Sequence, residues 1–190
     1  MDPEPAKKFT DLMIDIEGCS DLPDAAPHEI GLTFFNLAEP IWQQEPVNIA
    51  YHPSAISSIV LGMSVTTSTL KWWAEKLTKP LNLSAGDPIQ DILFNIIADF
   101  KEHAMPDARV WSRGNAYDLS SIRLLLHRCN LEIPWQYWRE RDVRSFLDAL
   151  GKETRREQTH IASEDAFNQA TSLSDAKHGA PPKADATTSP

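Results

Sequence analysis

The feature that most constrains this chain is an apolar segment near its start that ends in two acids. Residues 9–17 read FTDLMIDIE, a composition typical of a buried strand, and Asp15 and Glu17 stand at its carboxyl end. Side chains two positions apart on a strand share a face, so both carboxylates are expected to point the same way. Such a pair repels unless a cation lies between its members, and Mg²⁺ accepts carboxylate oxygens. The simpler alternative is a strand end whose acids are hydrated.

The rest of the chain favours an α/β fold with a mixed sheet, because strands come first, then helices, then strand–helix alternation. Further strands are expected at residues 28–36, 45–51 (antiparallel to 28–36), 108–111 and within 138–143. Helices are expected at residues 66–79, 89–103, 118–128, 143–151 and from about 160–162 onward. Asp87 and Pro88 are expected at the N-cap and N1 positions of the second helix.

Composition narrows the functional classes. The chain has 190 residues and a net charge of −9, which argues against coating nucleic acid or membrane through bulk charge. No apolar run approaches the roughly 18 residues that span a bilayer, no secretory signal is recognised, and the two cysteines are too few for a disulfide scaffold. A cytoplasmic location is therefore expected. All nine arginines fall within residues 109–156, which suits either an anionic partner or a solvated helical surface.

Two later segments carry further acids. Asp118 follows the aromatic Tyr117 at the start of an apolar helix, where an acid is commonly only an N-cap. His160 and Asp165 lie five positions apart near the start of the last helix, where an acid can simply favour the helix dipole. Each pattern taken alone has this structural explanation.

Taken together and in this order, D-x-E, aromatic–Asp and H-x4-D resemble the motifs of the DEDDh 3′→5′ exonucleases. The resemblance covers residues 9–173 and is closest to the exodeoxyribonucleases of tailed bacteriophages and the Rv2179c-like exoribonucleases. Residues 111–118 match a W-x-R-G-x-x-F-D run, Trp72 and Trp73 match a W-W pair, and residues 137–145 match an F-W-x-x-R-D-x-R-T run. The domain is accordingly assigned to residues 9–176, with a flexible N-terminus at 1–8 and a disordered Pro/Ala/Thr-rich tail at 177–190.

The resemblance implies a ribonuclease H-like fold, with a mixed five-stranded sheet flanked by helices. It implies the catalytic residues Asp15, Glu17, Asp118, His160 and Asp165. The four acids would ligate two Mg²⁺ or Mn²⁺ ions, with Asp15 bridging them and Asp118 acting through water. His160 would be the general base, since histidine as a residue type titrates near neutral pH. The expected reaction releases nucleoside 5′-monophosphates from a 3′ end.

The residues expected to contact substrate are Gly18, Trp72, Arg113 and Tyr117. Trp73 shares an apolar helix face with Leu70 and Leu77, which leaves Trp72 as the more exposed tryptophan. Gly18 departs from the threonine usual in the family, so its backbone contact remains but its hydroxyl is missing. Many relatives have an asparagine where this chain has Arg113 or Gly114. Further arginines that could meet phosphate are Arg139, Arg141 and Arg144, one of which Asp142 could hold in an ion pair.

Several functional readings stay open from the sequence. Single-stranded DNA is the favoured substrate, and an exoribonuclease of the same chemistry is the alternative. A catalytically silent nucleic-acid-binding module and an acidic DNA mimic are weaker rivals, because all five catalytic positions are intact and the arginines cluster. A homodimer is considered, no membrane partner is expected, and the location is the cytoplasm of a bacterium or an infected host cell.

Overall fold

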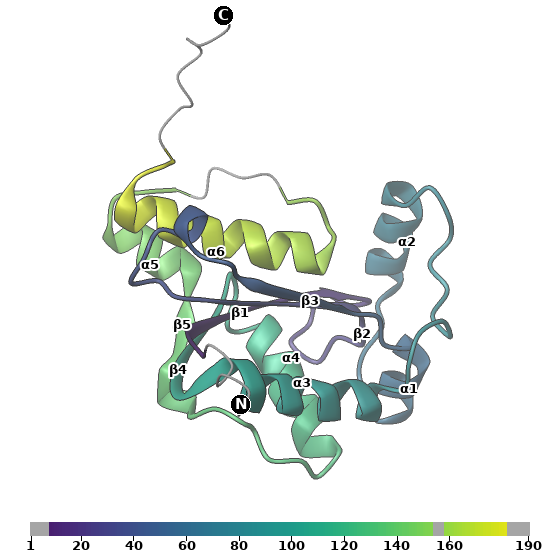
Figure 1. Cartoon of the computed structure of the whole chain (residues 1–190). Coiled ribbons are helices and arrows are strands. Elements are labelled where there is room, and N and C mark those ends of the chain that lie inside the picture. Colours follow the sequence, from purple (N-terminus) through teal and green to yellow (C-terminus); the bar gives the residue numbers. More distant parts are fainter. Residues whose placement is uncertain (1–7, 154–157, 182–190) are drawn as a thin grey trace, which may run out of the picture.

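A five-stranded mixed sheet forms the centre of the protein, in a computed structural model that describes residues 8–153 and 158–181 (Figure 1). The strands are β1 (Phe9–Gly18), β2 (Pro27–Phe35), β3 (Val47–Tyr51), β4 (Ala104–Ser112) and β5 (Glu140–Asp142). Their order is β3-β2-β1-β4-β5; β1–β2 and β2–β3 pair antiparallel, and β1–β4 and β4–β5 pair parallel. The predicted mixed five-stranded sheet is therefore confirmed, and β1 lies at its centre.

Helices cover both faces of this sheet. They are α1 (Ala55–Val60), α2 (Thr67–Lys76), α3 (Ile89–His103), α4 (Asp118–Arg128), α5 (Val143–Ala149) and α6 (Ala162–His178), with short 3₁₀ turns η1 (Ile41–Gln43) and η2 (Tyr137–Arg139). In Figure 1, α3 and α4 lie below the sheet, α5 and α6 lie above it, and α2 stands at one end. Within the described part of the chain, every helix is too short or too polar to cross a membrane.

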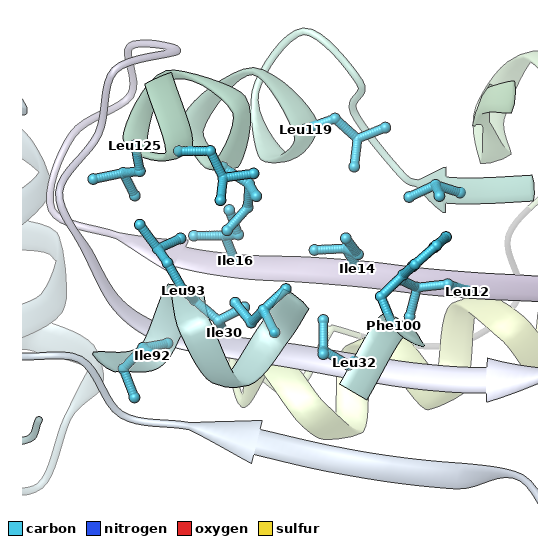
Figure 2. Close-up of a cluster of buried hydrophobic side chains, with 14 of the residues drawn as sticks. Leu12, Ile14, Ile16, Ile30, Leu32, Ile92, Leu93, Phe100, Leu119 and Leu125 are labelled. Atoms are coloured by element: carbon cyan, nitrogen blue, oxygen red, sulfur yellow. The ribbon is translucent and has the colours of Figure 1, made fainter. Parts of the chain in front are cut away.

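Strand periodicity sends alternate side chains of β1 to opposite faces of the sheet. Leu12, Ile14 and Ile16 are buried in the core between the sheet and helices α3 and α4 (Figure 2). Met13 points the other way, into a second core that it shares with apolar residues of α5 and α6. Asp15 and Glu17 have the parity of Met13, so their carboxylates face the α6 side of the sheet.

Gly31 on β2 allows α6 to begin directly over the sheet. It pairs with Asp15 of β1 in the strand register. A Cβ atom at Gly31 would overlap the backbone carbonyl of Ala162, the first residue of α6. A side chain there would push the helix start away, so this glycine sets the distance between α6 and the carboxyl end of β1.

Local differences from the sequence-based expectations have simple causes. The helix Ile89–His103 has the expected bounds, but Pro88 occupies the N-cap position and no side chain caps it, so the role expected for Asp87 is wrong. The α2 helix ends at Lys76, ahead of Pro80, and α1 is an element that no periodic pattern indicated.

The C-terminal boundary also differs from the expectation. Helix α6 continues through His178, so the start of a disordered tail at residue 177 is wrong. Lys177 Nζ donates to the carbonyl of Leu37 at 2.9 Å, and His178 Nε2 lies 2.9 Å from the same oxygen. Of the flexible N-terminus predicted at residues 1–8 and the tail predicted at 177–190, residues 1–7 and 182–190 lie outside the described residues.

Candidate active site

Four carboxylates from three elements converge at the carboxyl end of β1. Asp15 and Glu17 come from β1, Asp118 is the first residue of α4, and Asp165 lies in the first turn of α6. Their side chains are buried, with exposed fractions of 6%, 8%, 6% and 2% in that order. Three of them line a pocket of about 370 Å³ together with His160, and Asp165 is buried beside it. The structure thus brings all five predicted catalytic residues to one place.

Asp118 is more than a helix cap. The N-cap of α4 is Tyr117, and the backbone N–H groups of Tyr117 and Asp118 both donate to the carbonyl of Gly114. The Asp118 carboxylate lines the pocket beside Asp15, where it accepts hydrogen bonds from the backbone of Ile16 and the side chain of Ser112. The capping explanation that the sequence left open does not hold at this position.

Asp165 binds the segment that carries His160. Its carboxylate accepts hydrogen bonds from the backbone N–H groups of Thr159 at 2.8 Å and His160 at 3.0 Å. His160 has a φ of 58°, a left-handed conformation that residues other than glycine rarely adopt. The Nδ1 atom of His160 lies 3.6 Å from Oε1 of Glu17. The spacing of five residues therefore serves to hold the imidazole over the acids.

Burial makes Asp15, Glu17 and Asp118 hard to ionise. Burial, together with the charge of Asp165, raises the pKa of Asp15 to about 7, although the hydrogen bond from Gln169 opposes this rise. Burial and the charge of Asp15 raise the pKa of Glu17 to about 9. The pKa of Asp118 is also raised well above its usual value, by burial and by Asp15. The Arg113 and Arg144 guanidiniums at the pocket lower the pKa values of Asp15 and Asp118, respectively, but by less than burial raises them.

The donor set fits a divalent cation. One ligand atom each from Glu17, His160 and Asp165 lie within 4.8 Å of one another. Carboxylate oxygens are the ligands that Mg²⁺ and Mn²⁺ favour, and a bound cation would offset the burial and the mutual repulsion that raise the pKa values of Asp15, Glu17 and Asp118. A buried acidic cluster with raised pKa values is typical of a functional site.

Two aromatic side chains hold the chain that follows β1. The hydroxyl of Tyr117 donates to the carbonyl of Ser20 at 2.7 Å, and Trp73 Nε1 donates to the carbonyl of Gly18 at 2.9 Å. A Cβ atom at Gly18 would overlap the Tyr117 hydroxyl. The Cβ of Ala25 also lies too close for a side chain at position 18, so Gly18 fits the space that Tyr117 and Ala25 leave.

Trp72 forms a wall of the pocket. Its ring meets the His160 ring edge-on, with centroids 4.8 Å apart, and Lys76 Nζ lies 5.6 Å from the Trp72 ring centroid. Trp73 is buried and Trp72 is half-buried with a face in the pocket, as the helix periodicity indicated.

Of the four arginines considered for phosphate binding, two line the pocket and two have other partners. Arg113 and Arg144 line the pocket, whereas Arg139 lies 3.5 Å from Asp107 and Arg141 donates to backbone carbonyls. In the described residues no ion pair joins an arginine to Asp142; this carboxylate accepts from the Ser145 N–H at 2.8 Å and caps α5. The expected Asp142 ion pair is therefore wrong.

Two residues of the site escaped the sequence analysis. Gln169 of α6 donates from Nε2 to Oδ1 of Asp15 at 2.6 Å, and Gly31 sets the approach of α6. The signal for Gln169 was its place one helical turn after Asp165, which puts both side chains on the same helix face. Gly31 gave no signal beyond being a glycine within a strand.

Comparisons with known proteins agree with this geometry. The model of the 3′-5′ exoribonuclease Rv2179c-like domain matches residues 10–182. No curated protein matches.

Solved structures match over nearly the whole chain. The nuclease domain of 3′hExo, described as a DEDDh family member bound to rAMP, is 12% identical with a TM-score of 0.54, covering 92% of this chain and 96% of that one. The RNase domain of yeast Pop2 is 11% identical with a TM-score of 0.56, covering 88% and 76%. The cell-death related nuclease CRN-4 is 10% identical with a TM-score of 0.51, covering 87% and 63%. At these identities the likeness concerns the fold, and it confirms the expected ribonuclease H-like architecture.

Proposed function

Because this chain belongs to the Rv2179c-like 3′-5′ exoribonuclease family, we propose that it removes nucleoside 5′-monophosphates stepwise from the 3′ end of a single-stranded nucleic acid. The family makes the chain a hydrolytic nuclease of the 3′-5′ exonuclease class. The observation that carries the proposal is the convergence of Asp15, Glu17, Asp118 and Asp165 with His160 at one pocket.

The four acids would hold two divalent cations, Mg²⁺ or Mn²⁺. Support comes from their burial and from the raised pKa values of Asp15, Glu17 and Asp118, whose negative charge the neighbouring Arg113 and Arg144 only partly compensate. When bound, such ions lower the pKa of an attacking water and stabilise the leaving 3′ oxygen. Asp15 lies on the central strand, and its charge raises the pKa values of both Glu17 and Asp118, which supports Asp15 as a ligand that both ions would share.

His160 would take the proton of the attacking water. Its ring lies at the pocket, 3.6 Å from the Glu17 carboxylate, and is held from two sides. Asp165 binds its backbone N–H, and the edge of Trp72 packs against its ring. A base with a fixed position is what proton transfer requires.

The remaining pocket residues would hold the terminal nucleotide. Trp72 and Tyr117 offer aromatic surface, Arg113 and Arg144 offer positive charge, and Gly18 lines the pocket without a side chain. The pocket volume of about 370 Å³ is in the range of small-molecule sites, and the net charge of −9 disfavours a long footprint.

Both DNA and RNA remain candidates for the substrate. The motif matches at residues 72–73, 111–118 and 137–145 favour single-stranded DNA. RNA is the second candidate, because the family model that matches residues 10–182 describes an exoribonuclease domain. The chemistry proposed for the five catalytic residues is the same for both.

Matched oligonucleotides test the proposal. Single-stranded DNA and RNA of one sequence are 5′-labelled and incubated with Mg²⁺, with Mn²⁺ or with EDTA. We expect shortening from the 3′ end, release of 5′-monophosphates, resistance of 3′-blocked strands and no cleavage in EDTA. Asp165→Asn is the inactive control. Internal fragments, or equal cleavage of 3′-blocked strands, would contradict an exonuclease, and the ratio of DNA to RNA rates decides between the two substrates.

A further inference from the structure

Gln169 makes the one side-chain hydrogen bond recorded for Asp15 among the described residues. It lies on α6, is 3% exposed, and donates from Nε2 to Oδ1 of Asp15 at 2.6 Å. The contact joins residues 154 positions apart, across the interface between α6 and the central strand. Asp165 lies one helical turn earlier on α6, so a single helix face supplies both an acid of the cluster and a partner for another.

The other polar atom of the Gln169 amide, Oε1, supports the view that the hydrogen bond to Asp15 is the reason for a glutamine at this position. Its Oε1 is buried and has no hydrogen-bond partner in the part of the chain that the structure describes. A buried polar atom without a partner costs free energy that an apolar side chain of similar size would avoid. The bond to Asp15 offsets this cost, whereas helix packing alone would favour methionine or leucine.

A neutral donor suits a carboxylate that must also bind a cation. Lysine or arginine at this position would neutralise Asp15 and compete with a metal ion for it. An amide orients the carboxylate through Oδ1 without adding positive charge, and it leaves Oδ2 without a recorded partner among the described residues. Donors of this kind hold metal-ligating groups in place in metalloproteins.

We propose that Gln169 is a positioning residue that fixes the Asp15 carboxylate for divalent-cation binding. The inference rests on the proposed function, because it takes Asp15 as a metal ligand. Gln169 would neither touch the nucleic acid nor take part in proton transfer; it would set the orientation of one carboxylate and thereby the metal affinity.

The test compares Gln169→Met with wild-type protein by two titrations with Mg²⁺ and with Mn²⁺. One follows the metal-induced rise of the melting temperature, which needs no activity, and the other follows cleavage of the oligonucleotide. We expect the half-saturating metal concentration to rise about 10–100-fold in both, with the KM for oligonucleotide at saturating metal unchanged. Thr171→Val, on the same helix, is the matched control; its hydroxyl donates to the carbonyl of Phe167, and we expect wild-type titrations.

Each outcome decides the inference. A wild-type metal midpoint in Gln169→Met overturns it, as does a lower melting temperature in EDTA with an unchanged metal midpoint, which would show a merely structural residue. Gln169→Asn keeps an amide but is one methylene shorter, so it should weaken metal binding too. This variant replaces Gln169→Met in both titrations if the methionine variant fails to fold. If wild-type protein shows neither metal stabilisation nor cleavage, the proposed function fails and the inference with it.

Discussion

The carboxylates of Asp15 and Glu17 are more costly to ionise in the folded protein than in water. Burial is the main cause; the charge of Asp165 raises the pKa of both acids, and the charge of Asp15 also raises the pKa of Glu17. The sequence predicted that these two side chains share a face, and their place on the α6 side of β1 agrees with it. Their burial could not be predicted, because it depends on α4 and α6 closing over the end of the strand.

The first prediction follows from these two pKa values. Asp15 and Glu17 bind protons more tightly in the folded state, with pKa values of about 7 and 9 against 3.8 and 4.5 for the free groups. The folded protein therefore holds more protons than the unfolded chain, and stability falls as pH rises. In EDTA we expect the free energy of unfolding to decrease from about pH 5 to about pH 9.

Urea unfolding at several pH values measures this slope. Glu17→Gln removes one of the two groups and should give a shallower slope, whereas Thr171→Val should keep the wild-type slope. With saturating Mg²⁺ the decrease should shrink, because metal binding displaces the protons. A wild-type slope in Glu17→Gln would refute the assignment.

The second prediction concerns His160. If it is the general base, His160→Ala should lower kcat by about 10²–10⁴-fold, the usual contribution of proton transfer. Asp165 accepts hydrogen bonds from the backbone N–H groups of Thr159 and His160 and from the Thr159 hydroxyl, and none from the imidazole. The variant therefore keeps them, and metal-induced stabilisation should largely remain. Cleavage assays at saturating metal and thermal melts with and without metal measure the two effects.

His160→Gly is the matched control for the backbone. Glycine tolerates the φ of 58° at this position, so this variant should lose the same activity while melting no lower than His160→Ala. A His160→Ala variant that melts early but cleaves at the normal rate when folded would show a structural role for the imidazole instead.

At the scale of elements, the site depends on how α6 meets the sheet. The helix begins at Ala162 against Gly31 of β2, and this contact brings Asp165 and Gln169 to Asp15. The helix itself could be predicted from its sequence, but the close approach could not, since it depends on an absent side chain on a strand more than 100 residues earlier.

The third prediction tests this approach with Gly31→Ala. The added methyl group would overlap the Ala162 carbonyl, and backbone cannot yield as a flexible side chain does. We expect a loss of about 1–3 kcal/mol in unfolding free energy. Displacement of the α6 start should also lower kcat and raise the half-saturating Mg²⁺ concentration.

Gly114→Ala is the stability control for this variant. Its Cβ would lie at the ordinary contact distances of 3.7 Å from the Asp118 carboxylate and 3.8 Å from the Arg144 guanidinium. Denaturant melts of both variants should show a clear loss only for Gly31→Ala. Equal stabilities would mean that α6 adjusts without cost.

At the scale of the whole molecule, the last helix packs across several strands of the sheet and contacts the chain that follows β2. Helix α6 packs on β1, β2 and β3, and its last turn reaches Leu37 beyond β2. The sequence placed the end of the domain at residue 176, because the composition beyond it is rich in Pro, Ala and Thr. Composition could not show that Lys177 and His178 bind a distant carbonyl.

The fourth prediction compares two truncations. A chain that ends at Ala176 lacks the Lys177 and His178 contacts with the Leu37 carbonyl, whereas a chain that ends at Pro181 keeps them. We expect the shorter chain to lose about 1 kcal/mol, which lowers the Tm by roughly 2–4 °C for a domain of this size. Calorimetry of both chains beside the full-length protein measures this loss, and equal Tm values would show that these contacts add no stability.

The sequence by itself determined most of the elements and the identity of the catalytic candidates. Helix Ile89–His103 has the bounds that its apolar period and the preceding proline indicated, and β1 ends with its two acids as the apolar run implied. Such features depend on residues within a few positions of one another, so a linear pattern carries them. The motif order likewise needed no coordinates to predict a nuclease.

Only the tertiary structure decided how these residues work together. Gln169 meets Asp15 across 154 positions, Gly31 admits α6, and Tyr117 occupies the space that a side chain at position 18 would need. The raised pKa values of the acids follow from burial under helices that are distant in the sequence. Contacts and desolvation arise only when the chain is packed, and for this reason no local pattern could indicate them.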